Sequence, residues 1–230
     1  MLKNKPIELF TTEDGSHSLR VSDLDETYHS SHGALQESNH VFIKNGLSYW
    51  VNKNQSNELS IFEVGYGTGL NALLTAIRAK ELNKNIFYQS IELYPLPDEI
   101  TSQLNYSTLN ASEPKLFNLL HSSAWEKPVV INNHFTIHKK QASFLHYEVN
   151  YLFDIIYFDA FAPSKQPEMW KYSIIEKCYH LLKPNGIFVT YSAKGQLKRD
   201  LKKAGFIVES LPGPPGKFEM VRAVKTGTRI

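Results

Sequence analysis

The stretch Ile61-Phe-Glu-Val-Gly-Tyr-Gly-Thr-Gly-Leu-Asn-Ala-Leu-Leu74 decides the fold of this chain. A short apolar run leads into the alternating glycines Gly65, Gly67 and Gly69, and a helix-like apolar pattern begins at Leu70. This order predicts a strand, a loop of bare backbone and a helix N-terminus. Such a turn lets a nucleotide-like ligand approach the main chain and meet the unpaired N–H groups at the start of the helix.

The spacing of the glycines indicates the ligand. A dinucleotide fingerprint counted from Gly65 requires glycine at position 70, where this chain has Leu70. An acidic residue stands two positions before the first glycine, and this arrangement resembles the first motif of S-adenosylmethionine-dependent methyltransferases. The alternative is a glycine-rich turn that binds no ligand. The residues that we expect to bind the cofactor here are Glu63, Gly65, Tyr66, Gly67 and Gly69.

The composition is typical of a globular protein. Of the 230 residues, 42% are hydrophobic and 21% are charged. No apolar run approaches the ~20 residues that span a membrane, and the N-terminus lacks an apolar signal core. The single cysteine, Cys178, excludes an intrachain disulfide, and the histidines show no metal-ligand spacing. We therefore expect a cytoplasmic protein without a metal or a membrane partner.

Strand and helix patterns alternate after Ser60, which predicts a parallel α/β sheet with helices on both faces. The expected strands are Ser60–Val64, Ile86–Glu92, Phe135–Lys139, Phe153–Asp159, Ile187–Tyr191, Ile207–Ser210 and Phe218–Val224. The expected helices are Leu70–Glu81, Pro97–Leu109, Pro114–His121, Gln141–Tyr147, Pro167–Leu182 and Lys194–Ala204. The short turn from Leu211 to Gly216 makes the last two strands antiparallel neighbours. This Rossmann-like arrangement, with its antiparallel last strand, is that of a class I methyltransferase.

The first part of the chain has a different pattern. Ile7–Phe10 and Ser18–Val21 flank a turn and predict a β-hairpin, and a helix-like segment follows. These residues include too few apolar side chains for a core of their own. We therefore expect residues 1–58 to form a small N-terminal cap over the ligand edge, and residues 59–230 to form the Rossmann-like core of the same domain.

Residues that follow the strands face the ligand, since ligands of open α/β sheets bind beyond the carboxyl ends of the strands. Glu92 ends the second strand and is expected to accept hydrogen bonds from a ribose. Gln141 and Ala142 follow the third strand, where an adenine contact is expected, although Gln141 fits an ordinary helix start equally well. Asp159 ends the fourth strand and faces the transferable group, whereas Asp154 begins that strand and is expected to be structural.

Basic residues gather late in the chain, although the net charge is only +2. Such a cluster either contacts phosphates or forms a solvated helix face. Its members are Lys194, Lys198, Arg199, Lys202, Lys203, Lys217, Arg222, Lys225 and Arg229.

Several longer motifs resemble one family closely. They are Tyr28-x-Ser-x-x-Gly-x-x-x-Glu37, Phe62-Glu-x-Gly-x-Gly-Thr-Gly-Leu-Asn71, Glu92-x-x-Pro-Leu96, Phe158-Asp-x-Phe-Ala-Pro-x-Lys-x-Pro-x-Met-Trp170 and Gly213-x-x-Gly-Lys-x-Glu-Met220. Together they make the chain similar to the methyltransferase domain of the MnmC family of bacterial tRNA-modifying enzymes and to its stand-alone, MnmD-type relatives. The Asp-x-Phe-Ala-Pro segment is far more restrictive than a glycine loop.

The resemblance implies methyl transfer from S-adenosylmethionine to the 5-aminomethyl group of the wobble (2-thio)uridine, with tRNA bound through its anticodon arm. Asp159 would hold and deprotonate the amine, and Phe161 or Trp170 would stack on the uracil ring. Phe161, Pro163, Lys165 and Lys217 are the expected substrate-binding residues. The fused enzymes carry a second, flavin-dependent domain, whereas this chain shows no second glycine fingerprint. A separate enzyme is therefore expected to supply the aminomethyl precursor.

Two other functions stay open from the sequence. One is methyl or aminopropyl transfer to a small-molecule amine, because such enzymes also place an acid after the fourth strand. The other is a scaffold that binds the cofactor or tRNA without catalysis. The presence of both Glu92 and Asp159 argues against the scaffold, and the late basic residues favour a polyanionic substrate.

Overall fold

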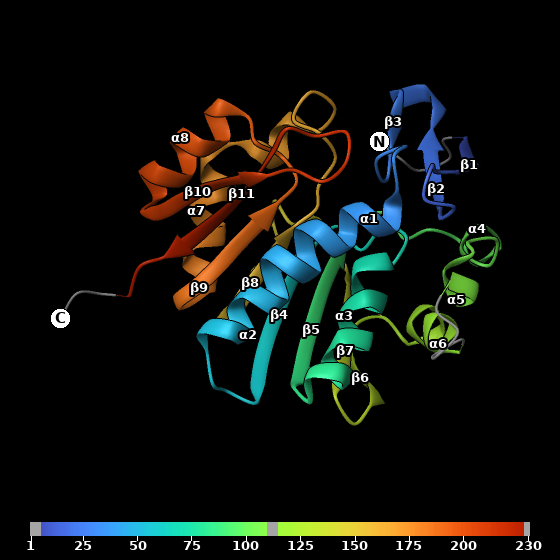
Figure 1. Ribbon diagram of the computed structural model, residues 1–230, viewed down its shortest axis with the longest axis horizontal. Helices are drawn as coiled ribbons and strands as arrows, with labels where there is room; N and C mark the ends of the chain where they lie inside the picture. Colours follow the sequence, from blue (N-terminus) through green and yellow to red (C-terminus); the bar gives the residue numbers. More distant parts are fainter. Residues whose placement is uncertain (1–5, 110–114, 228–230) are drawn as a thin grey trace.

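A computed structural model describes residues 6–109 and 115–227 of the chain. Its centre is an eight-stranded sheet with the order β10-β11-β9-β8-β4-β5-β7-β6 (Figure 1). The strands are β4 (Glu58–Val64), β5 (Asn85–Glu92), β6 (Pro128–Asn132), β7 (Phe135–Gln141), β8 (Phe153–Phe158), β9 (Leu182–Thr190), β10 (Phe206–Pro212) and β11 (Glu219–Lys225). Strands β7, β5, β4, β8 and β9 are parallel neighbours, while β6 and β11 run antiparallel to the strands beside them. The sheet confirms the predicted α/β fold.

Helices cover both faces of the sheet, and this explains why the central strands β4 and β8 are buried almost throughout. In β8, Ile155 and Tyr157 face one core while Ile156 and Phe158 face the other. The first face is covered by α3 (Leu70–Leu82), by α6 (Leu116–Ser122) and by the long helical segment α1 (Ala34–Ser38), η2 (Asn39–Ser48) and α2 (Tyr49–Lys53). The second face is covered by α7 (Tyr172–Leu181) and α8 (Gly195–Ala204).

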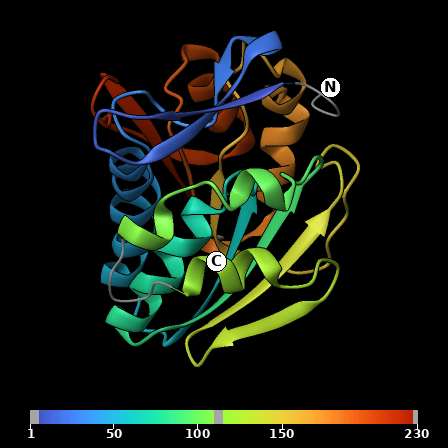
Figure 2. The same cartoon turned by 90° about the vertical axis from the view of Figure 1, so that its right-hand side faces the viewer.

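The N-terminal residues form a separate small sheet of β1 (Ile7–Thr11), β2 (His17–Val21) and β3 (Glu26–Thr27), with the turn η1 (Ser22–Leu24) between the last two. The first two strands pair antiparallel, as the hairpin prediction requires. Figure 2 shows this sheet crossing above the ends of the central strands. The helical segment from Ala34 to Lys53 instead packs on the face of the central sheet. The division at residue 58 stays a prediction.

Three expectations about secondary structure are wrong. The expected helix at Gln141–Tyr147 is the end of β7 followed by a turn, because Gln141 pairs in register with Glu92. The expected helix at Pro97–Leu109 is broken into α4 (Asp98–Thr101) and α5 (Tyr106–Leu109). Asn105, which lies between them, binds the β1–β2 hairpin through the N–H of His17 and the carbonyl of Gly15.

The third wrong expectation concerns the edge of the sheet, where β6 forms an eighth strand that the sequence pattern did not reveal.

The helix expected to begin at Pro114 is observed as α6, and Pro114 itself lies outside the described residues. The helix expected at Pro167–Leu182 is a short 3₁₀ turn, η3 (Pro167–Trp170), followed by α7. Pro167 takes the first position of that turn, where its missing N–H costs no hydrogen bond.

The described residues contain neither a membrane-spanning helix nor a group of metal-binding side chains. No helix within residues 6–109 and 115–227 is long and apolar enough to cross a membrane. In the same residues, no group of three or more His, Cys, Asp or Glu side chains is placed to hold a metal ion.

Asp154 ties the beginning of β8 to β4, in the structural role that its position predicts. Its carboxylate accepts hydrogen bonds from the N–H of Ser60 at 2.7 Å and from the Ser60 hydroxyl at 2.9 Å, and it pairs with Lys183 at 2.8 Å. The Ser60 groups are buried and would lose their acceptor if the carboxylate were removed.

We expect Asp154→Ala to lower the free energy of unfolding by about 2–3 kcal/mol, because buried donors would be left without a partner. Denaturant unfolding at neutral pH measures this loss. The exposed Glu58 on β4 supplies the control, and Glu58→Ala should change the free energy by less than about 0.5 kcal/mol. Equal stabilities of the two variants would contradict the role of Asp154.

Candidate active site

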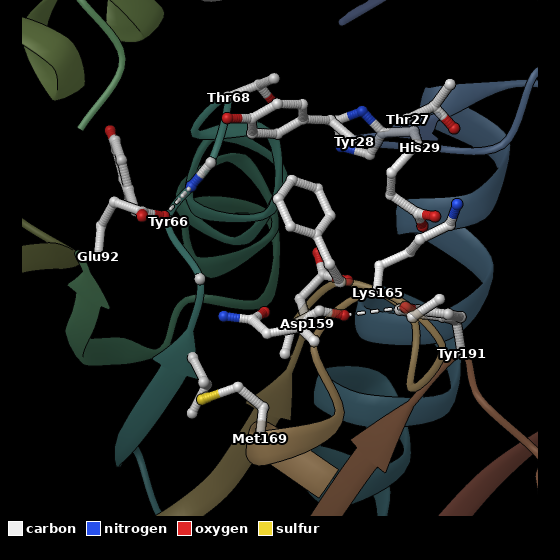
Figure 3. A pocket seen from close by; sticks show the side chains of 18 of the residues that line it. Thr27, Tyr28, His29, Tyr66, Thr68, Glu92, Asp159, Lys165, Met169 and Tyr191 are labelled. Carbon is white, nitrogen blue, oxygen red and sulfur yellow. Dashed lines mark hydrogen bonds between the residues drawn. The ribbon is translucent and has the colours of Figure 1, made fainter. Parts of the chain in front are cut away.

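A cavity of about 660 Å³ opens at the carboxyl ends of β4, β5 and β8, where the sequence predicts the ligand. Its walls come from the glycine loop after β4, the loops after β5, β7 and β8, and the N-terminal segment from Leu24 to Glu37. Figure 3 shows Glu92 on one side of this cavity, Tyr191 on the other, and Asp159 between them. The cavity therefore has a half beside Glu92 and a half beside Tyr191, and they meet at Asp159.

The glycine loop lies close to the backbone that follows β8. A Cβ atom on Gly65 would lie 2.8 Å from the carbonyl oxygen of Asp159, and the φ of Gly65 is +93°. The Gly65 N–H donates to the carbonyl of Ile91 at 3.0 Å. Only glycine fits this position without moving the chain. The loop thus brings the backbones of three neighbouring strands together at the cavity.

Glu92 lies at the cavity beside the same loop. Its carboxylate accepts hydrogen bonds from the N–H groups of Gly67 at 3.1 Å and Tyr94 at 2.9 Å. Burial raises the pKa of Glu92 above its usual range. A carboxylate held in this way keeps further acceptor sites for the hydroxyl groups of a ligand.

Glu63 is buried below the loop and does not line the cavity. Its carboxyl group accepts a hydrogen bond from the Ser90 hydroxyl at 2.6 Å, and burial raises its pKa to about 8. Asn71 also contacts this carboxyl group, and its amide donates to Asp159 at 2.8 Å. Asn71 therefore lies beside both Glu63 and Asp159.

Asp159 faces the centre of the cavity, as its position after β8 predicts. Its N–H donates to the carbonyl of Val64 at 3.0 Å, which fixes the backbone beside the glycine loop. Burial, and next the charge of Glu37, raise the pKa of Asp159 to about 7, while the hydrogen bond from Asn71 opposes this rise. The side chain is therefore poised between its protonated and ionised forms near neutral pH.

The second half of the cavity contains a partly buried ion pair between Lys217 and Glu37. Glu37 also accepts a hydrogen bond from the N–H of Ser30 at 2.7 Å. The Lys217 ammonium lies 3.9 Å from the ring centre of Tyr191, whose hydroxyl donates to the carbonyl of Ala160 at 2.9 Å. These contacts join the N-terminal segment, the loop before β11 and the end of β9 around Asp159.

Aromatic side chains lie between the two halves. Tyr28 and Phe161 meet edge to face with ring centres 5.2 Å apart, and Tyr28 also covers Gly67. The indole N–H of Trp170 donates to the carbonyl of Phe161 at 2.8 Å, and the Trp170 side chain is buried. Of Phe161 and Trp170, therefore, Phe161 lines the cavity, while Trp170 supports its backbone.

The structure gathers most of the predicted site residues around this cavity. The predicted residues that line it are Gly65, Tyr66, Gly67, Glu92, Ala142, Asp159, Phe161, Lys165 and Lys217. Glu63, Gly69, Gln141 and Pro163 are not among its lining residues. The N–H of Gln141 donates to Glu126 at 2.7 Å, and the Lys165 ammonium donates to the carbonyl of Leu24 at 2.7 Å. The ligand-binding roles of all these residues stay predictions.

Sequence reasoning assigned no role to four side chains that now stand out: Tyr28, Glu37, Asn71 and Tyr191. The first three belong to the motifs that carried the family resemblance, and that membership was a signal of their importance. Tyr191 directly follows β9. Since ligands of open α/β sheets bind beyond the carboxyl ends of the strands, its position at the end of this strand would have identified it.

The late basic cluster divides into two kinds of residue. Arg222 pairs with Glu209 at 2.6 Å, and the Lys225 ammonium donates to the carbonyls of Tyr179 and Leu182, so both serve the fold. Lys198 pairs with Glu219 at 2.5 Å. Lys194, Arg199 and Lys202 are exposed on or beside α8. Arg229 lies outside the described residues.

Comparison with known proteins agrees with this site. Residues 131–226 match a family described as S-adenosyl-L-methionine-dependent methyltransferases, which names the cofactor expected from the glycine spacing. The chain is 32% identical over 208 residues to the "tRNA 5-methylaminomethyl-2-thiouridine biosynthesis bifunctional protein MnmC" of Leptospira interrogans, and 32% identical over 213 residues to the protein of the same name from Cupriavidus necator. Each alignment covers 86% of this chain and 32% of the relative, so the chain spans about a third of their length. The expected resemblance to the MnmC proteins is confirmed.

Solved structures confirm the fold. The structure of MnmC2 from Aquifex aeolicus matches with a TM-score of 0.81 at 21% identity, over 98% of this chain and 72% of that one. Spermidine synthase from Thermotoga maritima matches with a TM-score of 0.59 at 14% identity, over 96% of this chain and 69% of that one. The fold is that of class I S-adenosylmethionine-dependent methyltransferases.

Gly65→Ala should lower the affinity for S-adenosylmethionine by at least about tenfold, because the new methyl group would push the glycine loop away from Asp159. Isothermal titration calorimetry measures this affinity. Gly15 supplies a matched control, since its φ is +83° but a Cβ atom there meets nothing within 4 Å. Gly15→Ala should cost stability and leave cofactor affinity unchanged. Unchanged affinity in Gly65→Ala would contradict the assignment of the loop.

Proposed function

We propose that this chain transfers a methyl group from S-adenosylmethionine to the 5-aminomethyl group of the wobble (2-thio)uridine in tRNA. One observation carries the proposal: the carboxylate of Asp159 lies in the cavity directly beside the glycine loop, between the half that contains Glu92 and the half that contains Tyr191. The names of the MnmC relatives support the choice of tRNA as the substrate.

The residues around the cavity fit the cofactor. Gly65 and Gly67 present bare backbone to the cavity, and Glu92 offers acceptors to the ribose hydroxyls. The backbone after β7, at Ala142 and Ser143, closes the same half of the cavity and would adjoin the adenine. When bound, the cofactor supplies a methyl group on a sulfonium, which is already activated for displacement.

Asp159 prepares the amine for attack. A primary alkylamine is protonated at neutral pH and has no free electron pair, so it must lose a proton before its nitrogen bonds to the methyl carbon. The Asp159 carboxylate would hold the ammonium by a charge-assisted hydrogen bond and accept its proton in the closed site. Asn71 holds the other side of the carboxylate and fixes its direction. Alignment of amine and methyl group supplies most of the acceleration.

The second half of the cavity would receive the nucleoside. Phe161 is placed to stack on the uracil ring, since unpaired anticodon bases are commonly held on aromatic side chains. Lys165 and Lys217 border this half, and the exposed cations of α8 would approach the anticodon arm. A tRNA substrate places the reaction in the cytoplasm. We further propose that a separate enzyme makes the aminomethyl group on which this chain acts.

The two alternative functions are less well supported. Spermidine synthase shares the fold at 14% identity, and a likeness of that degree says nothing about the acceptor. A scaffold without catalysis does not require a carboxylate oriented by Asn71 at the centre of the cavity.

Asp159→Asn should lower methyl transfer by at least about a thousandfold, because an amide neither holds an ammonium as a counter-ion nor accepts its proton. The substrate is tRNA that carries aminomethyluridine, and nucleoside mass spectrometry follows the product. Calorimetry should show cofactor affinity within about threefold of the wild type. The exposed Asp25 provides the control variant, Asp25→Asn, which should keep full activity. Normal turnover of Asp159→Asn would remove Asp159 from the mechanism.

The pH profile tests the state of Asp159 separately. Only the carboxylate form accepts a proton, so kcat/KM should rise as the pH increases through about 7, the pKa of Asp159. Asn71→Leu removes a hydrogen bond that lowers this pKa, so the rise should move to higher pH. The ratio of wild-type to Asn71→Leu kcat/KM should therefore be about tenfold larger at pH 6 than at pH 9. Parallel profiles for the two proteins would exclude this coupling between Asn71 and Asp159.

A further inference from the structure

Phe218 is the most exposed large hydrophobic side chain in the described residues. Its side chain is 94% exposed, compared with 73% for Val130, the next in order. The loop between β10 and β11, which carries Phe218, also contributes Gly216 and Lys217 to the lining of the cavity. Phe218 therefore directly follows, in the chain, a residue that lines the cavity.

The backbone around Phe218 is held firmly. The N–H of Gly213 donates to the carbonyl of Phe218 at 3.1 Å, and the N–H of Lys217 donates to the carbonyl of Pro214 at 2.9 Å. His40 donates to the carbonyl of Pro212 at 2.8 Å, and Pro214 is buried. The exposure of the ring therefore does not follow from a loosely held loop.

Lys217 and Phe218 are neighbours with opposite surroundings. The Lys217 ammonium is turned inward, between Glu37 and the ring of Tyr191, whereas the Phe218 ring faces solvent. Gly216 lies against the ring of His32, so the loop also touches the N-terminal segment. Figure 1 shows the loop between β10 and β11 reaching towards that segment. The loop between β10 and β11 thus borders the cavity with Gly216 and Lys217 and presents Phe218 to solvent.

The loop that carries Phe218 is joined to a helix that bears exposed cationic side chains. Lys198 on α8 pairs with Glu219, the residue after Phe218, and this ion pair joins the helix to the loop. Lys194 and Arg199 are exposed within one helical turn of Lys198. Proteins that bind single-stranded nucleic acid combine aromatic rings, which stack on bases, with cationic side chains, which meet the phosphates.

We propose that Phe218 stacks on an unpaired base that flanks the methylated uridine in the anticodon loop. This inference rests on the proposed function, because that function supplies the RNA. The target nucleoside enters the cavity beside Phe161, and the neighbouring base stays outside on the ring of Phe218. The loop thereby helps to hold the anticodon arm while the uridine is turned inward.

Steady-state kinetics on tRNA bearing aminomethyluridine tests the proposal. Phe218→Ala should raise KM for tRNA about tenfold and leave kcat and cofactor affinity within about twofold, because base stacking contributes to binding alone. Phe218→Trp should restore KM, since its ring also stacks. Val130 on β6 gives a matched control for an exposed apolar side chain, and Val130→Ala should behave as the wild type.

A second measurement locates the partner base. Binding of an anticodon stem-loop is compared with that of stem-loops lacking one base on either side of the target uridine. The stem-loop that lacks the base stacked on Phe218 should bind equally well to the wild type and to Phe218→Ala, because the ring then has no base to contact. If the wild type methylates tRNA and Phe218→Ala matches it in KM, the inference is overturned while the proposed function stands. If the wild type methylates no tRNA, the proposed function fails, and equal stem-loop affinities of wild type and Phe218→Ala overturn the inference as well.

Discussion

The backbones that leave β4 and β8 touch at the cavity, and the remainder of the site depends on this contact. The N–H of Asp159 donates to the carbonyl of Val64, and the Cα of Gly65 lies so close to the Asp159 carbonyl that no side chain fits between them. One contact therefore sets the distance between the cofactor loop and the carboxylate. Asn71, in the first turn of the helix after the loop, then fixes the direction of that carboxylate.

The substrate half is assembled from distant parts of the chain. Glu37 from the N-terminal segment pairs with Lys217 from the loop before β11, and Lys217 lies over Tyr191 from the end of β9. The charge of Glu37 contributes to the raised pKa of Asp159, so this half also tunes the group that handles the proton. In the proposed function, binding of the nucleoside and ionisation of the Asp159 carboxylate would be linked through this ion pair.

The sequence predicts the cofactor half better than the substrate half. Both β4 and β8 are short, mainly apolar strands that a glycine or an acid follows, and the expectation that ligands bind beyond the carboxyl ends of the strands places Glu92, at the end of β5, and Asp159 correctly at the cavity. The pairing of Glu37 with Lys217 joins positions 180 residues apart, and no local pattern reports it. The expected helix after Lys140 fails for a similar reason, since Gln141 is held by its strand partner Glu92 and by Glu126. At Gln141, the contacts made in the folded sheet therefore outweigh the local preference of the sequence for a helix.

We propose that the carboxylate beside the glycine loop serves the methylation of an amine on tRNA. The most direct test is nucleoside mass spectrometry of bulk tRNA from a strain that lacks the gene, with and without a plasmid carrying it. The unmethylated 5-aminomethyl nucleoside should accumulate in the deletion strain, and the plasmid should restore the methylated form. Identical nucleoside profiles in the deletion and parent strains would contradict the proposed methylation of the 5-aminomethyl group.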